Sequence, residues 1–116
     1  MKKIIKIATL FLLLFVLSNC SLNQIKNEAP LVNAIKLSKK FKINLPEEYK
    51  SGYIWQLNDN YNKTILTNIN TVWLGDKKGI DFNFEALSVG EVTLTLIKRK
   101  YVDTIENKTF IVKILE

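Results

Sequence analysis

The sequence predicts an all-β fold, an antiparallel sandwich of about seven short strands. Apolar and polar residues alternate at period two through most of the chain after residue 30, which is the spacing of a strand with one buried face. β-branched and aromatic residues are frequent in these runs, and turn-forming residues separate them. No stretch after the first 20 residues has the spacing of an amphipathic helix. Together these features predict an immunoglobulin-like sandwich.

Residues 1–19 have the features of an export signal. Three lysines within the first six positions form a basic start, and residues 7–17 are an almost unbroken apolar run. A bilayer core requires about 20 consecutive apolar residues, so this run is too short for a permanent membrane span. We therefore expect a signal peptide that is cleaved from the mature chain.

The only cysteine, Cys20, closes the apolar run. The residues Leu17-Ser18-Asn19-Cys20 resemble the lipobox of bacterial lipoproteins, although Asn19 stands where Gly, Ala or Ser is usual. The resemblance implies cleavage before Cys20, lipidation of that residue, and a bacterial cell-envelope protein anchored in a membrane. Ser21 is not the Asp that favours inner-membrane retention, so the outer membrane is favoured. The alternative is an ordinary secreted protein with a free thiol.

The predicted mature chain divides into a polar lipidated tether at residues 20–30 and a sandwich domain at residues 31–116. The tether lacks sustained apolar periodicity. The whole chain has a formal charge of +6, and removal of the three leader lysines leaves 14 basic against 11 acidic residues, or +3. No basic run interleaved with aromatic residues offers a base-stacking platform, so we expect no nucleic-acid partner.

The composition argues against catalysis. Because the chain has no histidine and one cysteine, it can form no Ser/His/Asp triad, no Cys/His dyad, no His-supported zinc site and no internal disulfide. Glu47 and Glu48 are adjacent carboxylates, but they follow Pro46 as a solvated turn without an oriented partner. The sequence therefore predicts a non-enzymatic protein without metal or cofactor, and we expect a monomer.

The predicted strands follow one another with turn chemistry between them. Their alternating apolar residues are Ile35 and Leu37; Phe41, Ile43 and Leu45; Tyr53 and Trp55; Ile80, Phe82, Phe84 and Ala86; Val92, Leu94 and Leu96; and Phe110, Val112 and Ile114. Turn residues lie at 38–40, 57–60, 75–79, 88–90 and 106–108. The predicted core aromatics are Trp55, Phe82, Phe84 and Phe110, each of which can bury about 150–250 Å².

Three stretches carry glycines, aromatic residues and basic residues in a distinctive order. The first is Lys50-Ser51 followed by Gly52-Tyr53-Ile54-Trp55. The second is Leu74-Gly75-Asp76-Lys77-Lys78-Gly79, which precedes Phe82 and Phe84. The third is the strand from Gly90, which leads into Arg99-Lys100-Tyr101-Val102.

In this order and spacing, residues 35–115 resemble the chagasin-type inhibitors of papain-like cysteine proteases, which are immunoglobulin-like sandwiches with three loops at one end. The family's Gly-aromatic-x-Trp and Leu-Gly motifs are retained. Residues 48–51 replace the family's Asn-Pro-Thr-Thr, with only Ser51 keeping a hydroxyl, and Lys77 and Lys78 are bulkier than the family's small loop residues. At the family's Arg-Pro-Trp stands either Lys100-Tyr101-Val102, without a gap, or Arg99-Lys100-Tyr101, with a one-residue shift; both keep a cation and an aromatic residue but not Pro and Trp. In the second stretch, a separate one-residue shift would bring Gly79 to the tip of the loop.

The resemblance implies a reversible inhibitor that occludes the cleft of a papain-like cysteine protease. The first loop would reach toward the protease's catalytic histidine, the second would cross its catalytic cysteine, and the third would clamp the far side. The implied binding residues are Lys50, Ser51, Gly52, Tyr53, Gly75, Asp76, Lys77, Lys78, Gly79, Arg99, Lys100, Tyr101 and Val102.

Tyr53, Arg99 and Tyr101 are the expected anchors of this binding surface, because Tyr and Arg dominate interface hot spots. An equally open interpretation places Tyr53 beneath the first loop as a support and leaves Arg99 as a solvated edge charge. The alternative function is that of a non-inhibitory immunoglobulin-like envelope lipoprotein that binds another cell-envelope protein. The departures from the family's loop motifs favour that alternative.

Overall fold

The computed structural model describes residues 23–47 and 49–116, so the predicted signal peptide and Cys20 lie outside the described residues. Within these ranges the chain forms eight strands and one short 3-10 turn. The elements are β1 (Asn23–Gln24), β2 (Val32–Lys36), β3 (Lys40–Leu45), η1 (Tyr49–Ser51), β4 (Tyr53–Leu57), β5 (Leu66–Trp73), β6 (Ile80–Ala86), β7 (Gly90–Lys100) and β8 (Asp103–Leu115).

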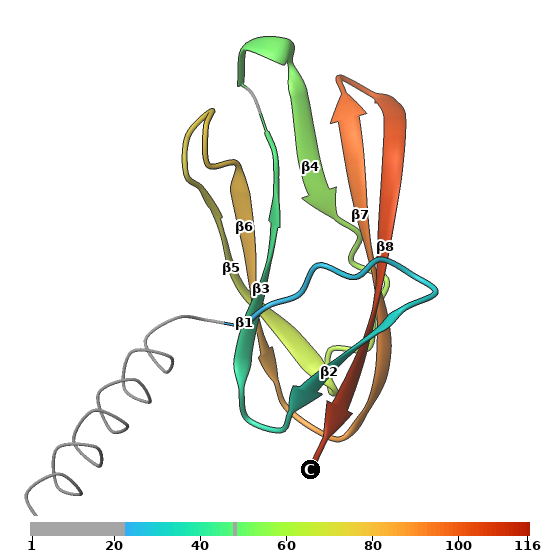
Figure 1. Cartoon of the computed structure of the whole chain (residues 1–116). Coiled ribbons are helices and arrows are strands. Elements are labelled where there is room, and N and C mark those ends of the chain that lie inside the picture. Colours follow the sequence, from blue (N-terminus) through green and yellow to red (C-terminus); the bar gives the residue numbers. More distant parts are fainter. Residues whose placement is uncertain (1–22, 48) are drawn as a thin grey trace, which may run out of the picture.

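The strands form two four-stranded sheets that pack face to face (Figure 1). Sheet A has the order β1-β3-β6-β5, and sheet B has the order β2-β8-β7-β4. The predicted all-β sandwich is therefore confirmed. Two edge pairs, β1 with β3 and β2 with β8, are parallel, whereas all others are antiparallel. Period-two alternation does not reveal strand direction, which is why the sequence predicted only antiparallel pairing.

The core lies between the two sheets and consists of the alternating residues of the predicted strands. Trp55, Phe82, Phe84 and Phe110 are all buried, as predicted. The ring of Phe84 stacks on that of Phe41 from the neighbouring strand, with 5.2 Å between the ring centroids. Burial of such large rings supplies much of the stability of a small domain.

The longer of the two strands that the sequence did not predict is β5, at the free edge of sheet A. Most of its residues are exposed, so the apolar alternation that identified the other strands is missing. Its register against β6 also shifts between Asn68 and Asn70, which marks a β-bulge at Ile69. A bulge reverses the inward and outward positions and further obscures the pattern.

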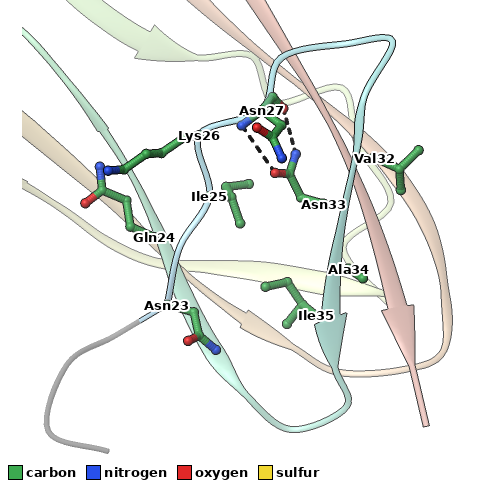
Figure 2. A pocket seen from close by; sticks show the side chains of 9 residues that line it. All are labelled: Asn23, Gln24, Ile25, Lys26, Asn27, Val32, Asn33, Ala34 and Ile35. Carbon is green, nitrogen blue, oxygen red and sulfur yellow. Dashed lines mark hydrogen bonds between the residues drawn. The ribbon is translucent and has the colours of Figure 1, made fainter. Parts of the chain in front are cut away.

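The N-terminal segment corrects the predicted tether, because its described residues are part of the folded domain. Asn23–Gln24 pairs with β3, and Ile25 is buried in the core. The side chain of Asn33 on β2 donates to the backbone oxygen of Asn27 at 2.7 Å and accepts from its backbone nitrogen at 3.3 Å (Figure 2). A groove of about 520 Å³ remains between this segment and β2. One buried isoleucine and backbone pairing hold the segment, and neither leaves a periodic sequence signal.

Three connections lie together at one end of the sandwich, whereas the C-terminus lies at the other (Figure 1). They are the β3–β4 loop at residues 46–52, the β5–β6 loop at residues 74–79 and the β7–β8 turn at residues 101–102. We call this region the loop end and the three connections the first, second and third loops. Among residues 23–47 and 49–116, no helix is long and apolar enough to cross a membrane.

Candidate functional site

The beginning of the first loop, where it leaves β3, is held by Trp55 of β4. The indole Nε1–H of this buried side chain donates to the carbonyl oxygen of Pro46 at 2.9 Å, and its backbone N–H donates to Oε2 of Glu47 at 2.8 Å. Glu47 was predicted to be a solvated turn residue, but this hydrogen bond gives its carboxylate a positioning role. These bonds fix where the loop leaves β3. Gly52, at φ +76°, makes the left-handed bend before β4.

Tyr53 lies half-buried on the inner face of sheet B, beneath the first loop. The ammonium nitrogens of Lys98 and Lys100 lie over its ring, at 5.0 and 5.2 Å from the ring centroid. A cavity of about 300 Å³ opens beside it, lined by Pro46, Ser51, Tyr53 and Lys98. This position beneath the loop agrees with a supporting role for Tyr53, and its role in binding a protease stays a prediction.

The second loop is a tight turn between two glycines. The carbonyl oxygen of Gly75 accepts hydrogen bonds from the backbone nitrogens of Lys78 at 3.2 Å and Gly79 at 2.9 Å. Gly79 is buried at the base, at φ +77°, where a Cβ atom would overlap the carbonyl oxygen of Leu45. It therefore does not lie at the tip, which residues 76–78 form as an exposed turn.

A polar network on sheet A supports the second loop. The side-chain nitrogen of Asn44 donates to the backbone oxygen of Lys78 at 2.9 Å and to Oδ1 of Asp81 at 2.7 Å. The other carboxylate oxygen of Asp81, which is buried, lies 3.3 Å from Nζ of Lys42. These residues were not predicted to matter, because outward polar positions on a strand usually face solvent. The hydrogen bonds tie the loop to a rigid strand pair.

The third loop is a two-residue turn that joins paired residues Lys100 and Asp103. Its two residues, Tyr101 and Val102, are 88% and 87% exposed, so they project farther into solvent than the other large apolar residues of the described chain. Tyr101 has a φ of +57°, a conformation that costs a residue with a side chain about 1 kcal/mol. The turn therefore holds an aromatic ring at its tip in a strained conformation.

Arg99, the other predicted anchor, lies on the outer face of sheet B. Ile54 and Thr104 are its neighbours in register on β4 and β8. The side chain is half-buried, and its Nε has no hydrogen-bond partner among the described residues. Arg99 is thus set back from the tip, and it is more buried than the solvated edge charge of the alternative interpretation.

Sequence reasoning missed Trp73 and named Leu74 only as part of the Leu-Gly motif; both residues lead from β5 into the second loop. Their side chains are 49% and 41% exposed, and they add apolar surface to the loop end. Trp73 lies two residues before Gly75, so an aromatic residue close to a loop glycine was the signal available. Exposed tryptophans are rare outside binding surfaces, which makes Trp73 a candidate contact.

The arrangement is suited to binding rather than to chemistry. The described residues include no group of three or more His, Cys, Asp or Glu side chains that could hold a metal ion. Instead, two sheets hold three short loops that present glycine backbone, lysines and aromatic rings at one end. Loops fixed in this way lose little conformational entropy on binding.

Comparison with known proteins gives structural matches alone. No family model matches the sequence, and no curated protein matches it. The fold is similar to the crystal structure of the cysteine protease inhibitor EhICP2 from Entamoeba histolytica, with a TM-score of 0.64 and 19% identity over 81% of this chain and 93% of that one. It is also similar to the solution structure of amebosin, with a TM-score of 0.57 and 17% identity over 81% of this chain and 96% of that one. The immunoglobulin-like sandwich predicted from the family resemblance is thus confirmed at the level of the fold.

Proposed function

We propose that this chain is a monomeric, reversible protein inhibitor of papain-like cysteine proteases that blocks the active-site cleft with its three loops. The observation that carries the proposal is the clustering of these loops at one end of a sandwich that shares its fold with a cysteine protease inhibitor. The glycine and aromatic residues of the loop motifs fall within or beside these loops. A shared fold alone does not assign an activity, so the inference of inhibition also depends on the residues of the loops.

The proposed mechanism is occlusion without covalent chemistry. The Gly52 and Gly75 backbones, which carry no Cβ, approach the protease's catalytic histidine and catalytic cysteine respectively. Tyr101 and Val102 pack beside the far wall of the cleft, and Trp73 extends the contact from the second loop. Because hydrogen bonds to Trp55 and Asn44 already fix the first and second loops, binding has little ordering cost.

We further propose that the protein is a bacterial lipoprotein anchored through Cys20, with the outer membrane as the favoured location. The sequence places only two residues between Cys20 and the first residue of β1, Asn23. An extended chain spans at most about 3.6 Å per residue, so the sandwich would stay within about 11 Å of the lipid attachment. The inhibitor would then act on proteases at the membrane surface.

Titration of papain and of a cathepsin-like protease with the mature chain, residues 20–116, tests the inhibitory function. The expected result is a stoichiometric and reversible loss of activity. Absence of inhibition at micromolar excess, together with a cooperative thermal transition that proves folding, would refute the proposal. The non-inhibitory envelope-binding module would then be the better account.

A further inference from the structure

At the loop end, the inner face of sheet B changes from an apolar surface to a ladder of cations and aromatic rings. Lys100 and Lys98 lie over the Tyr53 ring, at 5.2 and 5.0 Å from its centroid. Lys98 and Lys108 lie over the Trp55 ring, at 5.8 and 6.0 Å. The lysines come from β7 and β8 and the rings from β4, which pairs with β7 beside the first loop (Figure 1). These five residues are the lysine–aromatic ladder.

Two ammonium groups of the ladder form no ion pair with a carboxylate of residues 23–47 and 49–116. Lys98 and Lys100 face Glu106 and Asp103 in the register of β7 with β8, so each has an acidic neighbour. Even so, neither lysine forms an ion pair with a carboxylate of the described residues, and both acidic neighbours are exposed to solvent. Lys108 differs, because its Nζ lies 3.7 Å from a carboxylate oxygen of Glu28.

The positive charge is instead directed toward β4 and the cavity beneath the first loop. The π-face of Tyr53 attracts both ammonium groups, but a ring cannot accept the several N–H bonds that each ammonium can donate. The cavity of about 300 Å³ beside Lys98 is lined by Pro46, Ser51 and Tyr53. The end of the Lys100 side chain lies next to Gly52, at the same loop. Lys98 therefore lines a cavity that is large enough for a carboxylate side chain, and Lys100 lies nearby, over the same Tyr53 ring and beside Gly52 of the same loop.

We propose that this cavity binds an acidic side chain of the protein partner, whose carboxylate accepts hydrogen bonds from Lys98 and Lys100 while its methylene groups pack on Tyr53. The inference rests on the proposed function in taking that partner to be the inhibited protease. It adds a specificity rule, because a protease with an acidic residue opposite the first loop is bound more tightly than one without it. Charge-assisted hydrogen bonds in a partly desolvated site are the stronger class of such contacts.

A titration with acetate tests the cavity without any protease. The lysine side-chain NMR signals of the mature chain are followed against sodium acetate and against sodium chloride at equal ionic strength. We expect saturable acetate-specific shifts at Lys98 and Lys100, lost in Lys98→Met, while the exposed Lys113 responds equally to both salts. Equal responses to acetate and chloride at Lys98 and Lys100 would overturn the proposal.

A second experiment tests the use of the site against the protease that the mature chain inhibits. Lys98→Met and Lys100→Met are each expected to raise the inhibition constant about tenfold, because a hydrogen bond to a charged group is lost. Lys113→Met, on β8 away from the loop end, is the matched control and leaves the constant unchanged. An unchanged constant for folded Lys98→Met would overturn the partner role, even if acetate binds. If no protease is inhibited, the proposed function fails, and the acetate titration alone decides whether the cavity is a carboxylate site.

Discussion

Replacement of Tyr101 by glycine separates the stability of the third loop from its binding role. Tyr101 has a φ of +57°, which glycine adopts without the steric cost of about 1 kcal/mol that a side chain incurs there. Glycine also adds about 0.5–1 kcal/mol of conformational entropy to the unfolded chain, which opposes folding. The two effects nearly cancel, so the free energy of unfolding of Tyr101→Gly should lie within about 1 kcal/mol of the parent value.

The same change removes an aromatic ring that is 88% exposed at the loop end. A central interface tyrosine contributes about 2 kcal/mol or more to binding, so the inhibition constant for papain should rise about 30-fold. Urea unfolding followed by tryptophan fluorescence gives the first quantity, and tight-binding inhibition gives the second. Val102→Ala, at the adjacent and equally exposed position, is the matched control with a smaller expected loss. An unchanged inhibition constant in folded Tyr101→Gly would refute the third loop as a contact, and a large loss of stability would refute the strain argument.

Four further substitutions test the second loop and its supports. Gly79→Ala should lower the free energy of unfolding by at least about 2 kcal/mol, because φ is positive there and the added Cβ would overlap the backbone of β3. Gly75→Ala has open space around the added Cβ, so it should lower the free energy of unfolding by only about 1 kcal/mol. Similar urea midpoints for the two variants would contradict this reasoning. Asn44→Ala should cost about 1–3 kcal/mol in thermal or urea unfolding, because buried Asp81 loses a hydrogen bond, and a neutral result would remove the network from the account. Trp73→Ser should weaken papain inhibition about tenfold or more while the domain still unfolds cooperatively, and unchanged inhibition would exclude Trp73 from the interface.

The fold was predictable where burial imposes a period of two. The residues of β3, β6, β7 and β8 that were expected to be inside, such as Phe82 and Phe110, are buried. The edges of the sandwich were less predictable, since an edge strand such as β5 is mostly exposed and bulged at Ile69, and β1 is held by pairing with β3. A strand shows alternating apolar and polar residues only where one of its faces is buried, so an exposed strand has no such pattern.

The site was predictable in its loops and less so in the details of its side chains. The glycine motifs located the first and second loops, because left-handed turns at Gly52 and Gly75 need glycine. The third loop contains no glycine and was located by the family resemblance at residues 99–102. The turn expected at residues 106–108 was wrong, because these residues lie within β8. The sequence left the position of Tyr53 open, and the lysine–aromatic ladder was missed entirely. Lys98 continues the inward alternation of Leu94 and Leu96, but a lysine at an inner position gives no sign of whether it meets solvent, a carboxylate or a ring.

Protection of the catalytic cysteine of papain from alkylation tests the central claim of cleft occlusion most directly. The rate of inactivation by iodoacetamide is measured while the mature chain, residues 20–116, is added up to and beyond an equimolar amount. Occlusion by the three loops predicts that the rate falls in proportion to the added chain and becomes negligible at one equivalent. An undiminished alkylation rate at saturating concentration of the folded chain would contradict the account.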